Sequence, residues 1–320
     1  MPALNMVQAI NLALREEMRR DRSVVVLGED VGKDGGVFRI TDGLLPEFGE
    51  ERVIDTPLSE SGIVGAAIGM AVNGMRPVAE IQFMGFIYPA IDQIFSHAAR
   101  IRSRSRGRFS CPLVVRTPYG IGIRSPELHS ESSEALFCHM PGIKVVVPST
   151  PYNAKGLLAA AVRDPDPVIF LESTRLYRLI REEVPEGAYT LPLGKARIVR
   201  EGKEVTVISW GSMLHKTLQA VDGLDAEVID LMTLNPFDEE TITGSVKKTG
   251  RVVIVHEAPK TGGFGAELSA TIAEDAMLFL KGPVLRVTGP DAVIPLPKLE
   301  ERYAPSPERI RKALEEIMRY

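Results

Sequence analysis

The sequence has 320 residues, 44% of them hydrophobic and 25% charged, which is typical of a globular chain long enough to form two domains. Its formal net charge of −4 gives no electrostatic reason to expect a nucleic acid or an anionic membrane as a partner. No run approaches the roughly 20 apolar residues of a membrane span, and the only two cysteines are Cys111 and Cys138, so we expect a protein of the reducing cytoplasm.

The first half of the chain alternates between helical and strand patterns. Apolar residues recur with a helical period between Asn5 and Arg20, and the apolar run from Val24 to Leu27 predicts a buried strand. Further strands are predicted at 77–83, 112–116, 144–147 and 167–171, and further helices after Ser59, from Tyr88 to about Arg102 and from Tyr152 to Val162. Continuous apolar strands separated by helices predict a mostly parallel sheet with helices on both faces.

A segment rich in charge, proline and glycine, from about Arg178 to Lys203, interrupts this alternation and predicts a domain boundary. After it, strands are predicted at 204–210, 226–231, 251–256 and 283–287, and helices at 214–221, after Pro236, at 264–279 and from Ser306. We therefore expect two α/β domains, residues 1–185 and 186–320, of which the second is the smaller.

Polar residues follow several predicted strands, where ligands bind in open α/β sheets; these are Glu29, Asp30, Glu60 and His129. Glu60 has two interpretations. Ser59 could cap the following helix, with Glu60 in its first turn interacting favourably with the helix dipole. Alternatively, the glycines at 62, 65 and 69 admit a ligand, a second helix or a symmetry mate, and an acid at the mouth of an apolar cleft would hold or donate a proton.

His129 lies in a loop, G-I-G-I-R-S-P-E-L-H-S-E-S-S-E, that is too polar for a core. Because an imidazole titrates near neutral pH, a loop histidine beside hydroxyls and acids is a candidate acid–base group. Cys138 and His139 are adjacent, but neighbours in sequence point in different directions on a helix or strand, which argues against a reactive pair. The arginine-rich tract 100–108 could bind phosphate, although cations also cluster at helix C-termini, and Gly107 would end such a helix.

The motifs of the commonest phosphate, dinucleotide, serine-hydrolase and zinc sites are absent, namely G-x-x-x-x-G-K-[ST], G-x-G-x-x-G opening a helix after a strand, G-x-S-x-G and H-E-x-x-H. Other stretches form a different pattern: V-V-V-L-G-E-D-V-G, G-G-V-F-R, D-T-P-L-S-E-S-G-I-V-G, R-P-V-A-E-I-Q-F, A-I-D-Q-I, P-E-L-H-S-E-S, P-S-T-P-Y-N-A-K-G-L-L and H-E-A-P-K-T-G-G-F-G-A-E. In this order the whole chain resembles the beta subunit of the thiamine diphosphate-dependent 2-oxo acid dehydrogenases. The resemblance implies a transketolase-type pyrimidine-binding domain followed by the transketolase C-terminal domain.

The resemblance also assigns roles to site residues. In this family the glutamate at the position of Glu60 hydrogen-bonds a ring nitrogen of the cofactor's aminopyrimidine and favours the imino tautomer, which takes the thiazolium proton and leaves the nucleophilic ylid. Leu58 and Gln82 match positions lining the same pocket, and Phe86 matches the aromatic residue that packs on the pyrimidine. His129 matches the histidine that faces the thiazolium and the incoming lipoyl group, and it would transfer protons in decarboxylation or in reductive acylation.

Two further features follow from the resemblance. Glu29 matches an acid near the subunit interface that would relay charge or protons between paired sites. Some members also bind potassium in this subunit, and the matching positions here are Cys111, Leu113, Val114, Ala161, Asp164 and Asp166. Oxygen ligands at these positions would suit a hard monovalent cation. In this sequence P-D-P stands where an asparagine-containing turn is more usual.

The partners are implied in the same way. The cofactor's diphosphate and its magnesium require a Gly-Asp-Gly motif in the wider family, and this sequence contains none. An alpha subunit would therefore supply that half of the site in an alpha2-beta2 heterotetramer, and the glycine helix after Glu60 would suit contact between two beta subunits. The C-terminal domain would dock the subunit-binding domain of a dihydrolipoyl acyltransferase, with the carboxylate of Tyr320 as a contact, and the lipoyl domain of that protein would reach the site.

The implied substrate is a small 2-oxo acid, either pyruvate or a branched-chain one. Phe83, Met84 and Phe86 predict an apolar wall that is compatible with either acid. Two other classes of protein stay open, a non-catalytic interaction or scaffold subunit and a self-contained transketolase-like synthase. Cofactor binding by the isolated chain would favour the synthase, and assembly without turnover would favour the scaffold.

Overall fold

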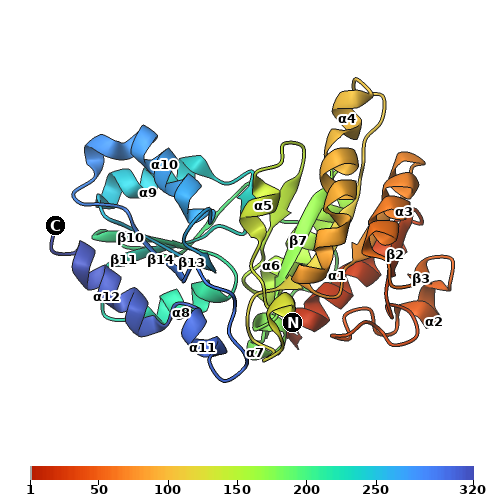
Figure 1. Cartoon of the computed structure of the whole chain (residues 1–320), viewed down its shortest axis with the longest axis horizontal. Coiled ribbons are helices and arrows are strands. Elements are labelled where there is room, and N and C mark those ends of the chain that lie inside the picture. Colours follow the sequence, from red (N-terminus) through yellow and green to blue (C-terminus); the bar gives the residue numbers. More distant parts are fainter. Residues whose placement is uncertain (1) are drawn as a thin grey trace.

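Two sheets with helices on both faces make up residues 2–320, the part of the chain that the computed structural model describes (Figure 1). The first sheet has the strand order β12-β6-β7-β5-β4-β2-β3. Its strands are β2 (Val24–Gly28), β3 (Val53–Asp55), β4 (Arg76–Glu80), β5 (Val114–Tyr119), β6 (Lys144–Val146), β7 (Val168–Ser173) and β12 (Thr233–Asn235). All neighbours pair in parallel except β12 and β6. The prediction of a mostly parallel sheet is confirmed.

Helices cover both faces of this sheet. On one face lie α1 (Met6–Arg20), α6 (Pro151–Arg163) and α7 (Leu176–Leu179), whose apolar residues form a core with Val24 and Val26 of β2. Asn5 begins α1 with a capping box, in which Asn5 and Gln8 satisfy each other's backbone amides. The other face is covered by α3 (Glu60–Val72), by the helical segment 84–104 and by α5 (Glu134–Cys138).

The helix predicted from Tyr88 to about Arg102 is irregular. Its turns are of the 3-10 type at Met84–Ala90, of the π type at Gln93–His97, again 3-10 at Ala98–Arg100, and α-helical only in α4 (Ile101–Arg104). Pro89 lies inside the first turn and has no backbone N–H to donate, so a regular α-helix cannot continue through it. Gly107 ends the segment with a φ of 78°, and its amide donates to the carbonyl of Arg102.

The second sheet has the order β14-β13-β10-β11-β9 and is parallel except for β9. Its strands are β9 (Arg197–Arg200), β10 (Val205–Ser209), β11 (Ala226–Asp230), β13 (Val252–Pro259) and β14 (Leu285–Gly289). Figure 1 shows α9 (Glu239–Thr249) and α10 (Gly265–Ala276) on one side of it and α8 (Ser212–Ala220) and α12 (Pro307–Ile317) on the other. The short elements are α2 (Leu44–Phe48), α11 (Glu300–Tyr303) and the pair β1 (Ala3–Leu4) and β8 (Glu182–Glu183).

The two halves of the chain share a sheet and a hydrophobic core in addition to the segment that connects them. Strand β12 comes from the second half but pairs with β6 at the edge of the first sheet. One core cluster also contains residues of both halves, among them Ile143 and Trp210. The segment between β7 and β9 is held by Lys155 of α6, whose ammonium donates to the carbonyls of Pro185 and Gly187 at 2.7 and 2.9 Å. The boundary at 185/186 stays a prediction.

Membrane insertion has no support in the helices. None of the helices within residues 2–320 combines the length and the apolar character needed to cross a bilayer.

Both cysteines are free thiols. Burial, followed by the charge of Glu134, raises the pKa of the Cys138 thiol well above its ordinary value, which disfavours the thiolate that a reactive Cys138–His139 pair would need.

Candidate functional site

The residues expected to form a site converge on one edge of the first sheet. Strands β5, β4, β2 and β3 are neighbours and run in parallel, so their carboxyl ends lie side by side. Glu29 follows β2, Glu60 follows β3 at the start of α3, Gln82 follows β4, and His129 lies in the loop after β5. This edge is where ligands bind in open α/β sheets.

Two carboxylates approach each other at this edge. Burial raises the pKa of Glu29, and the neighbouring charges of Glu60 and Asp30 raise it further. Gln82 lies beside them, because its amide donates to a carboxylate oxygen of Asp30 at 3.3 Å. Asp55, a residue the sequence analysis missed, accepts hydrogen bonds from the amides at positions 32 and 33 at 2.6 and 3.1 Å and so fixes the loop that begins at Glu29. The edge therefore carries several acidic side chains and a loop whose conformation is fixed by Asp55.

Aromatic rings surround the imidazole of His129. The ring centroids of Phe83 and His129 are 4.4 Å apart, and those of Phe86 and His129 are 5.0 Å apart in an edge-to-face arrangement. Phe83 and Phe86 also contact each other edge to face at 5.5 Å. Within the described residues, the buried Nδ1 of His129 has no hydrogen-bond partner. The rings hold the imidazole in place, and its Nδ1 is buried among them without a hydrogen bond to any described residue.

Several details differ from the sequence expectations. Ser59 precedes α3, but its side chain makes no capping hydrogen bond. The contact that the capping interpretation requires of Ser59 is therefore absent. Leu58 is 78% exposed, and nothing in residues 2–320 covers it. Met84 is fully buried in the core and is not part of an apolar pocket wall, because the 3-10 turns of 84–90 direct it inward while Phe86 stays half-buried.

Gly85 permits the close approach that places His129. A Cβ atom at position 85 would lie 2.5 Å from the carbonyl oxygen of Leu128 and 2.8 Å from its Cα, inside van der Waals contact with backbone. Leu128 is in the 3-10 turn Glu127–His129. The chain can therefore place the imidazole against Phe83 and Phe86 only if residue 85 has no side chain.

We expect Gly85→Ala to move the turn 127–129 away from the aromatic pair and to lower turnover about 10-fold or more, because a small displacement of an acid–base group is costly. Protein stability should fall much less, since Leu128 is on the surface. Activity and thermal unfolding of the same preparation would measure both effects. The matched control is Gly244→Ala in α9, where a Cβ would meet no atom within 4 Å. Unchanged activity of Gly85→Ala would show that the turn can shift without affecting the site.

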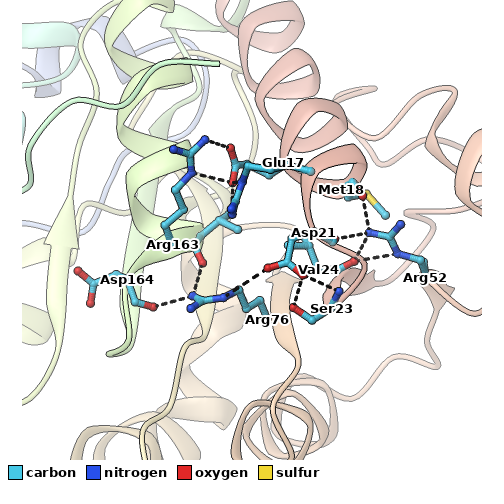
Figure 2. A network of polar contacts seen from close by, with 11 residues as sticks. Glu17, Met18, Asp21, Ser23, Val24, Arg52, Arg76, Arg163 and Asp164 are labelled. Atoms are coloured by element: carbon cyan, nitrogen blue, oxygen red, sulfur yellow. Dashed lines mark hydrogen bonds and ion pairs between the residues drawn. The ribbon is translucent and has the colours of Figure 1, made fainter. Parts of the chain in front are cut away.

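The turn expected to bind potassium is instead occupied by positively charged side chains. The ammonium of Lys144 donates to both carboxylate oxygens of Asp164 at 2.7 and 2.6 Å, and Arg102 donates to Asp166 at 2.6 Å. In Figure 2, Arg76 reaches from β4 to the carbonyl of Asp164; the distance is 3.2 Å, and the same guanidinium donates to the carbonyl of Val162 at 2.8 Å. Three cationic groups already satisfy these oxygens.

The other expected ligands offer little more. The carbonyls of Cys111 and Ala161 accept backbone hydrogen bonds from Leu113 and Asp164, at 2.8 and 3.2 Å, and the carbonyl of Leu113 accepts one from β7 at 2.9 Å. Val114 has no side-chain oxygen and lies within β5. Within residues 2–320, no group of three or more His, Cys, Asp or Glu residues could hold a metal ion. These hydrogen bonds and ion pairs argue against a potassium ion at this turn, and the potassium site stays a prediction.

The melting temperature of the chain should consequently be the same, within about 1 °C, in potassium, sodium and choline chloride at equal ionic strength, because an ion that does not bind cannot stabilise the folded state. Thermal unfolding followed by circular dichroism measures this. The variant Lys144→Met frees the carboxylate of Asp164 and should melt at a lower temperature. A potassium-specific increase for the unmodified chain would restore the cation site.

A buried ion cluster lies beneath the same edge, and the sequence analysis missed it. Arg116 of β5 pairs with Glu80 of β4 and, through two nitrogens, with Glu172 of β7 at 2.7 and 2.6 Å. Tyr177 donates to Glu172 at 2.7 Å, and its ring contacts Phe38, which in turn contacts Phe83. Burial lowers the pKa of Arg116, but the two carboxylates outweigh burial and hold it above its ordinary value. The cluster fixes three neighbouring strands beneath the aromatic wall.

Comparison with known proteins agrees with this architecture. The family described as transketolase, pyrimidine binding domain matches residues 2–180, and the family described as transketolase, C-terminal domain matches residues 194–310. The chain is also similar to a solved split-gene transketolase, described as an inactive beta4 tetramer, with a TM-score of 0.81 and 23% identity over 99% of both chains. The fold and the site define a two-domain protein of the transketolase type.

The relatives narrow the class. The chain is 50% identical, over the full length of both proteins, to the pyruvate dehydrogenase E1 component subunit beta of Bacillus subtilis (strain 168), and 50% identical, again over full length, to the 2-oxoisovalerate dehydrogenase subunit beta of the same organism. It is 51% identical to the pyruvate dehydrogenase E1 component subunit beta of Acholeplasma laidlawii over 97% of this chain and 96% of that one. The chain belongs to the E1 beta subunits of the 2-oxo acid dehydrogenases, enzymes in which the beta subunit acts with an alpha subunit.

Proposed function

We propose that this chain supplies the pyrimidine half of a thiamine diphosphate site that, completed by an alpha subunit, decarboxylates pyruvate or a branched-chain 2-oxo acid and transfers the acyl group to a lipoyl domain. The observation that supports this most is the position of Glu60 in the first turn of α3, beside Glu29 and at the sheet edge that also carries the His129 loop. Relatives named for pyruvate and for 2-oxoisovalerate are equally similar at 50% identity, so both substrates stay within the proposal.

Each residue at this edge has a chemical task in the proposal. When bound, the cofactor supplies a thiazolium carbon that acts as the nucleophile toward the 2-oxo acid. Glu60 shares a proton with a ring nitrogen of the aminopyrimidine, while Phe86 packs against that ring and Leu58 and Gln82 line its pocket. His129, fixed by Phe83 and Phe86, delivers a proton to the lipoyl sulfur or to the reacting 2-oxo acid. Relay of charge between paired sites through Glu29 is part of the same proposal.

An alpha subunit completes the site. The sequence contains no Gly-Asp-Gly to hold a magnesium–diphosphate group, so the alpha subunit holds both. The exposure of Leu58 supports a pocket whose second wall comes from another chain. The expected assembly is an alpha2-beta2 heterotetramer. The helix α3 presents small residues at its exposed positions 62, 66 and 69, a face on which another helix could pack closely.

A calorimetric titration tests the shared site. Thiamine diphosphate with magnesium is titrated into this chain alone and then into its mixture with a candidate alpha subunit. Binding in the mixture only is the expected result. Tight binding to the isolated chain would overturn the proposal in favour of a self-contained synthase, and an assembly that binds the cofactor without turning over either 2-oxo acid would favour a scaffold subunit. The cytoplasmic location expected from the two cysteines stays a prediction.

The far end of the second domain suits a protein partner, which we take to be the subunit-binding domain of a dihydrolipoyl acyltransferase. Apolar side chains after α10 are strongly exposed, with Leu278 at 96%. The C-terminal Tyr320, 60% exposed, lies beside Gly282, where a Cβ would be 2.8 Å from its ring. Apolar exposed residues at this end of the domain provide contact area for a protein partner.

Deleting Tyr320 or replacing Leu278 with alanine should weaken acyltransferase binding about 10-fold each, because exposed apolar anchors contribute on the order of 1–2 kcal/mol at an interface. Assembly with the alpha subunit should be unaffected. Surface plasmon resonance with the isolated subunit-binding domain measures the affinity. Leu179→Ala, which removes an exposed leucine from the first domain, is the matched control. Equal affinities for all four proteins would eliminate this surface as the docking site.

A further inference from the structure

A backbone hydrogen bond joins the two ends of the loop that carries His129, and we call these joined ends the neck of the loop. The amide of Gly120 donates to the carbonyl of Glu131 at 2.9 Å, so residues 120–131 form a closed loop. Between these ends, residues 122–129 are exposed or half-buried, whereas Gly120 and Ile121 are buried. The tip contacts the first domain through Leu128 beside Gly85 and His129 beside Phe83 and Phe86, and the neck fixes the two ends from which this tip extends.

The second domain holds this neck. The side chain of Ile121 is fully buried in the core cluster of the second sheet, together with Val207 and Val255. Glu257, which is 3% exposed near the end of β13, accepts a hydrogen bond from the amide of Ile121 at 2.5 Å. The same carboxylate oxygen accepts one from the hydroxyl of Ser132 at 3.4 Å. One side chain of the second domain thus contacts both ends of a loop that belongs to the first.

The residues around Glu257 leave space for its carboxylate and fix its orientation. Gly120 has a φ of 78°, and a Cβ there would lie 2.7 Å from the carboxylate oxygen, so a residue with a side chain would displace Glu257. Ser212 donates to the second carboxylate oxygen at 3.1 Å and fixes its orientation. Burial raises the pKa of Glu257, while the hydrogen bonds from Ile121 and Ser212 oppose that rise and favour the charged form. A further carboxylate, Glu300 of α11, accepts from the amide of Gly122.

We propose that Glu257 is a positioning residue, which clamps the neck of the loop 120–131 to the second domain so that the imidazole of His129 stays against Phe83 and Phe86. The effect on turnover rests on the proposed role of His129, whereas the clamp itself concerns only this chain. Glu257 does not touch the reacting atoms and acts through the loop. Through this clamp the second domain contributes to catalysis in addition to docking a partner.

Hydrogen exchange measured by mass spectrometry on the full chain, alone and assembled with the alpha subunit, tests the clamp. In Glu257→Ala the amides of residues 120–132 should exchange about tenfold faster, because a buried charge-assisted hydrogen bond is lost at the neck. Glu257→Gln keeps an oxygen that can accept from Ile121 and should restore most of the protection. The matched control is Glu227→Ala, which removes another buried carboxylate of the second sheet, one that pairs with Lys248 and does not contact the loop.

Activity measurements separate the clamp from the function proposed for His129. Acyl transfer to a lipoyl domain should fall about tenfold in Glu257→Ala, and the reaction with an artificial electron acceptor should fall less. Unchanged loop exchange in Glu257→Ala overturns the inference, and so does an equal increase in Glu227→Ala, because the effect would then be global. Faster loop exchange with equal losses in both reactions would support the clamp and reject the role of His129 in reductive acylation.

Discussion

Replacing Glu60 with glutamine is expected to slow exchange of the thiazolium carbon proton by about 10²- to 10⁴-fold in the assembled enzyme, the usual contribution of a positioned acid–base group. A glutamine is the same size and can still donate to a ring nitrogen, so cofactor binding should persist, but it cannot share a proton with that nitrogen. Rapid mixing with heavy water, acid quench and proton magnetic resonance of the released cofactor measure the exchange rate. Calorimetry on the same preparation measures whether the cofactor still binds.

The neighbouring acid provides the matched control. Glu29→Gln removes the second carboxylate of the pair and changes the charge at this edge by the same amount. If Glu60 alone handles the proton, the control should lose much less exchange than Glu60→Gln. Near-normal exchange in Glu60→Gln would mean that its carboxylate serves only as a first-turn acid of α3, interacting with the helix dipole.

Replacing Arg116 with methionine is expected to lower the free energy of unfolding by about 3–5 kcal/mol, the usual cost of leaving buried charges without their partner. The side chains of Arg116, Glu80 and Glu172 are all nearly inaccessible to solvent, and without Arg116 two buried carboxylates would remain, of which only Glu172 accepts from the hydroxyl of Tyr177. Denaturant unfolding at constant pH measures the loss. Because the cluster lies under the aromatic wall, activity should fall as well.

The pH dependence of the stability of Arg116→Met follows from the direction in which the pKa of Glu80 is shifted. Burial outweighs the attraction of Arg116 and raises the pKa of Glu80 above its ordinary value in the folded protein. A group with a raised folded pKa binds more protons in the folded than in the unfolded state, so its contribution to stability falls as the pH rises. Without Arg116 the rise should be larger, and the deficit of Arg116→Met should therefore shrink as the pH falls toward about 4.5.

A triple variant decides whether the loss comes from charge or from packing. Glu80→Gln combined with Arg116→Met and Glu172→Gln removes all three charges and keeps similar volumes. Its stability should lie closer to that of the unmodified protein than to the single variant, since no unpaired charge is buried. If the triple variant is as unstable as Arg116→Met, packing of the arginine accounts for the effect and the electrostatic explanation fails.

The main strands and helices could be predicted because they depend on local patterns. The apolar runs that form β2 and β7 are buried on both faces, and the helical period of α1 places Ile10 and Leu14 in the core. Strands β9 and β12 were missed because each is short and gains its stability from a neighbouring strand far away in sequence. The irregular segment 84–104 was read as one helix, although Pro89 was a visible signal against regular turns.

The site could be predicted in part for the same reason. Glu60 and His129 were chosen because polar residues after apolar strands mark the ligand edge, and the roles that the family resemblance gave them stay predictions. The contact between Glu257 and Ile121 joins residues 136 positions apart, and no local pattern reports such a contact. For the potassium site, the match of ligand positions did not include Lys144 and Arg102, whose side chains donate to Asp164 and Asp166. Candidate polar residues at strand ends could be recognised in the sequence, whereas the distant residues that contact them in the folded chain could not.

The antiparallel pairing of β12 with β6 also limits how this chain can be divided. A fragment ending near residue 185 would lack β12, so the outer side of β6, with Val145 and Val146, would present unpaired backbone groups at a newly opened edge. Such open apolar edges recruit strands from other molecules. Expressed by itself, the first domain would therefore be prone to aggregate, and a soluble form would require that residues 233–235 be grafted back onto it or that the edge be charged by mutation.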